Sequence, residues 1–164
     1  MARVYVSLGS NIDRESNLRG GLADLRRAFG ELALSPVYES SAVGFEGDPF
    51  LNLVAAFDTG LPIEAVDAEL SRIEERHGRV RGEERFAPRT LDIDLLLYGD
   101  QVHRRPGLIV PREEILDYAF VLKPLADLAP DERHPLLGRT YAELWRDFDD
   151  PRQRLLRVDL SVGL

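Results

Sequence analysis

Residues 88–99 read PRTLDIDLLLYG, an apolar run that carries two aspartates one residue apart. Successive side chains of a β-strand point to opposite faces, so the run divides into two sets. One face is expected to carry Leu91, Ile93, Leu95 and Leu97, and the other Asp92, Asp94, Leu96 and Tyr98. Because one set is wholly aliphatic and Leu96 follows the acids on the other side, the pattern predicts a central, buried strand.

The two aspartates of this strand are expected to share one small volume. Residues i and i+2 of a strand lie about 6.5–7 Å apart, and two carboxylates buried together are costly unless a cation lies between them. A hard divalent ion, Mg²⁺ above all, suits such a pair and can bridge it to phosphate oxygens. The alternative is an exposed edge strand with an acidic outer face, which the aliphatic opposite face disfavours. Asp92 and Asp94 are therefore candidate metal ligands and catalytic residues.

Six arginines precede the aspartate pair, and four glutamates dilute their charge. The arginines are Arg72, Arg76, Arg79, Arg81, Arg85 and Arg89. The planar guanidinium groups of Arg79 and Arg81 suit bidentate phosphate contacts, and Arg89 can approach the same ligand from the adjoining loop. Such a run alone is more often a solvated surface. Beside two candidate metal ligands, it favours binding of a small polyanion.

The composition limits the class of protein. The 164 residues carry a net charge of −8, and 44% of them are hydrophobic, which predicts a single domain over residues 1–164. An acidic chain is a poor ligand for nucleic acid, and no apolar run approaches the roughly 20 residues that span a membrane. The absence of cysteine excludes thiolate catalysis and fits a cytoplasmic location. Without an obvious exposed apolar stripe, we expect a monomer.

Hydrophobic periodicity predicts the order of elements along the chain. Strands are expected at 3–8, 32–40, 50–58 and 88–99, and helices at 18–29, 62–78, 112–118, 119–128 and 140–147. Gly30 is expected to end the first helix. The order β-α-β-β-α-β is that of a ferredoxin-like α+β unit, with an antiparallel sheet flanked by helices and additional C-terminal helices.

Asn52 is a polar residue inside the apolar run of the third strand. It is either a satisfied core amide or a group that recognises the edge of a heterocycle, since an amide both donates and accepts hydrogen bonds. Phe50 shares its strand face, and Phe120 comes later in the chain. Two such rings can enclose a flat aromatic ligand, although most phenylalanines simply fill a core.

The stretch RFAPRTLDIDLLLYG at 85–99 closely resembles the signature of the 6-hydroxymethyl-7,8-dihydropterin pyrophosphokinase family. The segments SLGSN at 7–11, FLN at 50–52 and GRVR at 78–81 also resemble that family in order and spacing, so the likeness covers about residues 2–130. The resemblance implies transfer of a pyrophosphoryl group from ATP to the pterin hydroxymethyl oxygen, with release of AMP, in folate biosynthesis.

The same resemblance implies roles for individual residues. Asp92 and Asp94 would hold two Mg²⁺ ions, and Arg79 and Arg89 would contact the ATP phosphates with help from Arg81. The pterin would be bound by Asn52, stacked between Phe50 and Phe120, and read at its remaining edge by backbone groups near Ser40 and Val43. Glu74 would help to fix the neighbouring loop on the nucleotide side.

The chain departs from the family pattern at four positions: Phe86, Gly82, Arg112 and Tyr118. The most informative is Arg112, which stands where the family usually places an ATP-contacting histidine. An arginine there can still bind phosphate, so we retain Arg112 as a nucleotide-binding candidate. Two alternatives stay open: a non-catalytic pterin- or nucleotide-binding regulator, and a Mg²⁺-dependent nucleic-acid enzyme, which the acidic composition disfavours.

Overall fold

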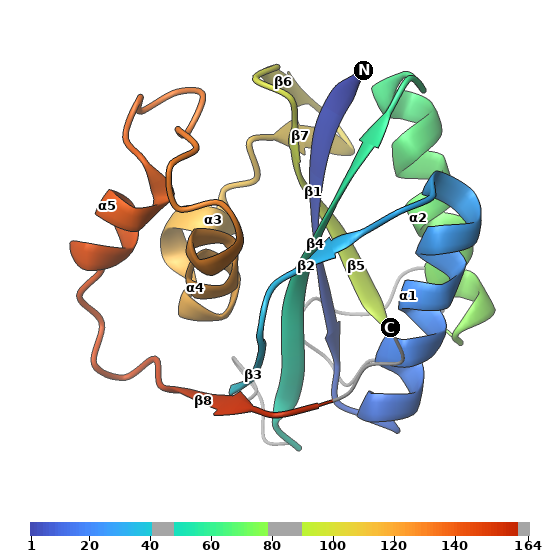
Figure 1. Cartoon of the computed structure of the whole chain (residues 1–164), viewed down its shortest axis with the longest axis horizontal. Coiled ribbons are helices and arrows are strands. Elements are labelled where there is room, and N and C mark those ends of the chain that lie inside the picture. Colours follow the sequence, from blue (N-terminus) through green and yellow to red (C-terminus); the bar gives the residue numbers. More distant parts are fainter. Residues whose placement is uncertain (41–47, 79–89, 161–164) are drawn as a thin grey trace.

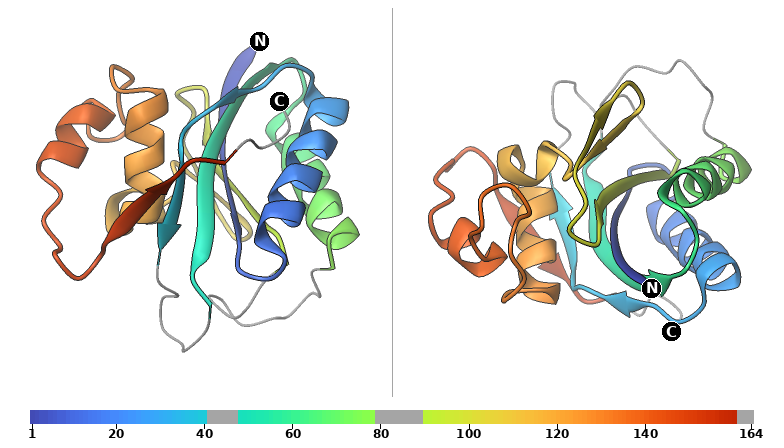
Figure 2. Two further views of the ribbon diagram at one scale, coloured as in Figure 1. Left: turned by 60° about the horizontal axis from the view of Figure 1, so that its bottom comes forward. Right: turned by 90° about the horizontal axis from the view of Figure 1, so that it is seen from above.

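A computed structural model describes residues 1–40, 48–78 and 90–160 of the chain. Over these residues the protein is an α+β structure, with an antiparallel sheet that has helices on both faces (Figure 1). Helices α1 (Arg14–Phe29) and α2 (Ile63–Arg76) cover one face. The other face carries α3 (Glu114–Asp117), α4 (Ala119–Leu128) and α5 (Tyr141–Arg146), as the two views of Figure 2 show. None of the described helices is long and apolar enough to cross a membrane.

The main sheet has six strands in the order β5-β1-β4-β3-β8, and β2 also pairs with β4. These strands are β1 (Ala2–Ser10), β2 (Ala33–Leu34), β3 (Val37–Ser40), β4 (Phe50–Thr59), β5 (Asp92–Tyr98) and β8 (Leu155–Val158). All described pairings in it are antiparallel. A separate hairpin joins β6 (His103–Arg105) to β7 (Leu108–Val110).

The predicted elements are present with shifted boundaries. The segment 32–40 is divided into β2 and β3, because Ser35 and Pro36 interrupt the pairing with β4. Ser35 compensates for the break: its backbone N–H donates to the Val54 carbonyl, and its hydroxyl accepts from the Val54 N–H at 2.8 Å. Helix α1 ends at Gly30, which has φ 88°, as predicted. The periodicity did not reveal β6 or β8.

The aspartate strand β5 lies at the edge of the sheet, so the prediction of a central strand is wrong. Two groups cover its outer backbone. The Glu74 carboxylate on α2 accepts the Ile93 N–H at 2.8 Å, and the Arg112 N–H donates to the Leu96 carbonyl at 3.0 Å. These bonds satisfy backbone groups that an edge strand otherwise leaves unpaired.

The predicted alternation of β5 fails beyond Leu95 because the strand contains a bulge. Val6 pairs with Leu95 but Tyr5 pairs with Leu97, so Leu96 is an extra residue in the ladder. Leu97 therefore joins Leu96 on the α4 side, while Tyr98 joins Leu95 on the side of α1 and α2. The two aspartates precede the bulge and keep the predicted common face.

Each face of the sheet has its own apolar core. Leu8, Leu22 and Phe57 are among the fully buried side chains under α1 and α2. Gly21 lets α1 approach closely, since a Cβ there would lie 2.9 Å from Leu91 Cδ2. On the other face, α4 and α5 cover Leu96 and its neighbours. Burial of each such side chain is worth about 1.5–3 kcal/mol.

Candidate active site

A row of directly opposed residues crosses the sheet at its polar end. Asp92 on β5 pairs with Gly9 on β1, Gly9 with Asn52 on β4, and Asn52 with Tyr38 on β3. Directly opposed residues in an antiparallel sheet point to the same face, and Tyr38 bonds to α4 on that face. The side chains of Asp92 and Asn52 therefore point to the face of the sheet that α3, α4 and α5 cover.

Gly9 leaves space in the middle of this row. A Cβ at Gly9 would lie 3.0 Å from Asn52 Oδ1 and 3.7 Å from the Phe50 ring. Any larger side chain would therefore fill the gap between the Asp92 carboxylate and the Asn52 amide. The glycine thus separates the carboxylate of Asp92 from the amide of Asn52 on the same face of the sheet.

The Asp94 carboxylate lies beside the guanidinium group of Arg112. Arg112 Nη2 is 3.4 Å from Asp94 Oδ1, and Arg112 Nε donates to the Glu114 carboxylate. Burial opposes the charge on Arg112, but Asp94 and Glu114 outweigh it and hold the Arg112 pKa above its ordinary value. Arg112 thus brings a permanent positive charge to the aspartate pair, and the bond from its N–H to the bulge at Leu96 fixes its backbone there.

Glu74 is buried behind the aspartate strand rather than open on its carboxylate face. Its carboxylate accepts the N–H of Ile93, the residue between the two aspartates. A buried carboxylate that accepts a backbone N–H gains a charge-assisted bond. Glu74 therefore holds the backbone that presents Asp92 and Asp94.

Asn52 and Ser40 form a buried polar pair at the end of β4 and β3. Asn52 Nδ2 donates to Ser40 Oγ at 2.7 Å, and both residues are more than nine-tenths buried. Phe50, which pairs with Ser40 in the ladder, is half-buried on the same face. The Ser40 hydroxyl orients the amide, whose Oδ1 remains an acceptor and whose Nδ2 carries a second N–H donor.

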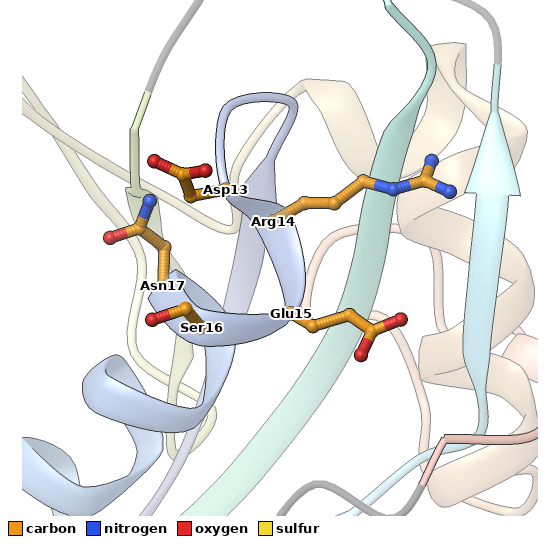
Figure 3. Close-up of a pocket in the computed structure, with 5 residues that line it drawn as sticks. All are labelled: Asp13, Arg14, Glu15, Ser16 and Asn17. Carbon is orange, nitrogen blue, oxygen red and sulfur yellow. The ribbon is translucent and has the colours of Figure 1, made fainter.

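Arg14, at the start of α1, contacts the end of the β3–β4 pair from the face of the sheet opposite α4. Figure 3 shows it pointing away from Asp13 and Asn17 and across β4 toward β3. Its guanidinium group lies 2.7 Å from Glu39 and donates to the Pro49 carbonyl at 3.1 Å. Glu39 and Pro49 are the neighbours of Ser40 and Phe50, so this contact fixes the two strands that carry the polar pair.

The sequence of residues 5–130 matches the model of the 7,8-dihydro-6-hydroxymethylpterin-pyrophosphokinase (HPPK) family. The chain belongs to this family. A relative from Pseudomonas aeruginosa, named 2-amino-4-hydroxy-6-hydroxymethyldihydropteridine pyrophosphokinase, is 46% identical over 147 residues, or 87% of this chain and 89% of that protein. A relative of the same name from Aquifex aeolicus is 37% identical, over 87% and 90% of the two chains.

Solved structures agree on the fold. The structure described as Plasmodium falciparum HPPK-DHPS wild type with pteroate matches 88% of this chain with a TM-score of 0.69. The sequence identity is 15%, and the chain spans only 42% of that longer protein. This likeness therefore concerns the HPPK fold alone.

The remaining HPPK residues that the sequence singled out fall into two groups. Phe120 is the second residue of α4 and stacks on Tyr118, with ring centroids 5.2 Å apart and an angle of 26° between the planes. The other group lies outside the described residues and comprises Val43, Arg79, Arg81, Gly82, Phe86 and Arg89. Within the described ranges, no set of three or more histidine, aspartate or glutamate residues is arranged to hold a metal ion.

Sequence reasoning missed Tyr38, which lies next to Asn52 in the row. Its hydroxyl donates to Asp127 on α4, and Lys123 donates to the other oxygen of the same carboxylate at 2.8 Å. Burial and the Asp127 contact raise the pKa of Tyr38 to about 12, so the phenol is neutral at physiological pH. The alternation of side chains along β3 would have indicated Tyr38 as a neighbour of the site, since Tyr38 and Ser40 point to the same face.

Proposed function

We propose that the protein transfers pyrophosphate from ATP to the hydroxymethyl group of 6-hydroxymethyl-7,8-dihydropterin, giving AMP and the pterin diphosphate in folate biosynthesis. The observation that carries the proposal is the row Asp92, Gly9 and Asn52, which sets the aspartate strand beside a buried amide and an aromatic ring on one face of the sheet. Membership of the HPPK family and the names of the relatives support the same reaction.

The aspartate pair fits Mg²⁺ that is shared with ATP. Both carboxylates are partly exposed on one face, and Mg²⁺ usually takes only one or two carboxylates, with water and substrate phosphates completing its shell. We assign Asp92 and Asp94 as ligands of two Mg²⁺ ions. When bound there, the ions would neutralise the triphosphate and orient it for in-line transfer.

The cationic side chains complete the nucleotide site. Arg79 and Arg89 would contact the transferred phosphates, and Arg81 would assist them. Arg112 would add its charge from the Asp94 side, since it already lies beside that carboxylate. Glu74 would contribute indirectly, through the Ile93 N–H that it holds.

The pterin would lie against the Asn52 side of the row. The Asn52 amide would bond to the edge of the ring system while Ser40 keeps it oriented. Phe50 and Phe120 would stack on the two ring faces, and backbone groups near Ser40 and Val43 would bond to the remaining edge. The hydroxymethyl group would then face the aspartate pair across Gly9.

The reaction itself needs no enzyme nucleophile. The pterin hydroxymethyl oxygen forms a bond to the β-phosphorus, the bond from that phosphorus to the AMP oxygen breaks, and the hydroxyl proton is released to water. The side chains act by positioning the two substrates and by stabilising charge as it moves.

We also propose that residues 1–164 act as one monomeric, cytoplasmic domain with a ferredoxin-like core. The element order β1-α1-β3-β4-α2-β5 and the sheet order β5-β1-β4-β3 support that core. Sedimentation or light scattering on the purified chain would test the monomer.

The test of the function is formation of AMP. Purified protein, ATP, Mg²⁺ and the pterin should yield AMP and pterin diphosphate in equal amounts, separated by ion-exchange chromatography. Omission of the pterin is the control for ATP hydrolysis. Chelation of the metal should stop the reaction, and added Mg²⁺ should restore it. If the pterin binds but no AMP forms, the proposal fails in favour of a binding regulator.

A further inference from the structure

The C-terminal segment lies beyond the residues that match the family model, yet it contacts both walls of the candidate pterin site. The family match ends at residue 130. After α5 the chain runs to a turn at 150–153 and then enters β8, which pairs with β3 so that Leu155 opposes Ser40 and Arg157 opposes Tyr38 (Figures 1 and 2). The segment thus extends the sheet beside the Asn52–Ser40 pair.

Gln153, just before β8, bonds to the junction of α3 and α4. Its Oε1 accepts the Ala119 N–H at 2.8 Å, and its Nε2 donates to the Asp117 carbonyl at 2.9 Å. The first N–H groups of a helix have no partner within the helix. The N-cap residue of α4 is Tyr118, whose side chain makes no capping bond. A side chain 34 residues away therefore supplies the cap.

The turn holds the Gln153 carboxamide in place. The Gln153 N–H donates to the Asp150 carbonyl at 3.0 Å, and Nε2 lies 3.2 Å from the Asp150 carboxylate. Arg152 donates to the same carboxylate at 3.0 Å. A fixed carboxamide loses less conformational entropy when it caps a helix than a mobile one would.

We propose that Gln153 is a positioning residue of the pterin site, which fixes the start of α4 and with it the ring of Phe120. Phe120 directly follows Ala119, whose N–H Gln153 binds. Two residues after Gln153, Leu155 begins the pairing of β8 with β3 and lies opposite Ser40. One short segment thus sets the spacing between the aromatic wall and the polar wall. The inference rests on the proposed stacking role of Phe120.

The test measures binding of the pterin and of ATP separately. Gln153→Ala should raise the pterin Kd about tenfold, as loss of one or two hydrogen bonds predicts, and leave the Kd of ATP within twofold. Gln153→Glu keeps the acceptor for Ala119 but places a carboxylate against the Asp117 carbonyl and the Asp150 carboxylate, so its pterin Kd should rise at least as much as that of Gln153→Ala. Gln101→Ala is the matched control, since Gln101 is an exposed glutamine bonded to His103 and should change neither Kd.

A double-mutant cycle shows whether Gln153 acts through Phe120. In a Phe120→Ala background, Gln153→Ala should change the pterin Kd by less than twofold. Equal effects in both backgrounds would overturn the inference, as would an unchanged pterin Kd in Gln153→Ala or parallel losses of pterin and ATP binding. Should Gln153→Ala fail to fold, Gln153→Met, which keeps the length of the side chain without its hydrogen bonds, decides by the same criteria.

Failure of the proposed function would look different. Wild-type protein would then form no AMP from ATP and the pterin, even where the pterin binds. A Phe120→Ala variant with unchanged pterin binding would instead remove the stacking role on which the inference rests.

Discussion

The two faces of the sheet differ in what they bury. The face under α1 and α2 is closed by aliphatic and aromatic side chains such as Leu22 and Phe57, which are inaccessible to solvent. The opposite face is apolar only where α4 covers it, around Leu96 and Leu97. Its remaining end is half-open and carries polar side chains, the partly exposed Asp94 and the buried Asn52.

This difference means that one face of the sheet mainly stabilises the fold and the other carries the candidate active site. Apolar burial supplies most of the free energy of folding, so the closed face should determine whether the chain folds. Polar groups on the half-open face cost free energy unless they are paired, and the Asn52–Ser40 and Asp94–Arg112 contacts reduce that cost. Substitutions on the two faces should therefore affect different measurements.

The largest effect is expected on the closed face. Phe57→Ala should lower the free energy of unfolding by about 3–5 kcal/mol, because it removes a buried ring that stacks on Phe29 with centroids 4.2 Å apart. Urea denaturation measures this loss. Below the unfolding transition the Kd values of both substrates should stay within a few-fold of wild type. Loss of substrate binding in the folded variant would contradict the division between the faces.

On the half-open face, Asp94→Asn should reduce AMP formation by about 10²–10³-fold, because it removes charge that stabilises the bound metal and phosphates. Its urea midpoint should fall only slightly, because Arg112 keeps its bond to Glu114. Asp58→Asn is the control: this exposed carboxylate on β4 pairs with Arg3 at the far end of the sheet. A fully active Asp94→Asn variant would refute the metal assignment.

Asn52 tests the boundary between the two roles, since it is buried yet belongs to the site. Asn52→Ala should raise the pterin Kd about tenfold and lower the free energy of unfolding by about 1–2 kcal/mol, because the Ser40 hydroxyl loses its partner. The Kd of ATP should not change. Calorimetric titration with each substrate measures both constants, and a change confined to ATP would place the pterin elsewhere.

The smallest effect is expected from Tyr38 at high pH. Burial raises its pKa to about 12 in the folded protein, above the ordinary value of 10.0. The proton is thus held more tightly in the folded state, and that contribution to stability is full below pH 10 and disappears as the pH rises through about 12. Tyr38→Phe should therefore lose less stability than wild type between pH 10 and 12 in urea denaturation. Identical pH profiles would contradict this.

The sequence predicted much of the site because the relevant signals are local. Alternation around Asp92 and Asp94 depends only on strand geometry, so both acids were placed on one face before any pairing was known. The same holds for Phe50 and Asn52 on β4. The helix end at Gly30 followed from the left-handed backbone that glycine adopts there.

Contacts between segments that are distant in the chain were not predicted from the sequence. The edge position of β5, the bulge at Leu96 and the pairing of β8 depend on which strands meet. Arg112 was a candidate by its place in the chain, but only the structure shows its backbone bonded to Leu96 and its side chain beside Asp94.

By itself, then, the sequence determined most of the elements and the shared face of the two acids, because the periods of two and 3.6 residues can be read within each segment. It also determined which residue types suit metal and phosphate. Only the tertiary structure decided what those elements lie against: Glu74 behind the aspartate strand and Gln153 at the start of α4. The physical reason is that a hydrogen bond between distant segments forms only when the fold brings them together. The sequence around one partner does not indicate which residue the other partner is.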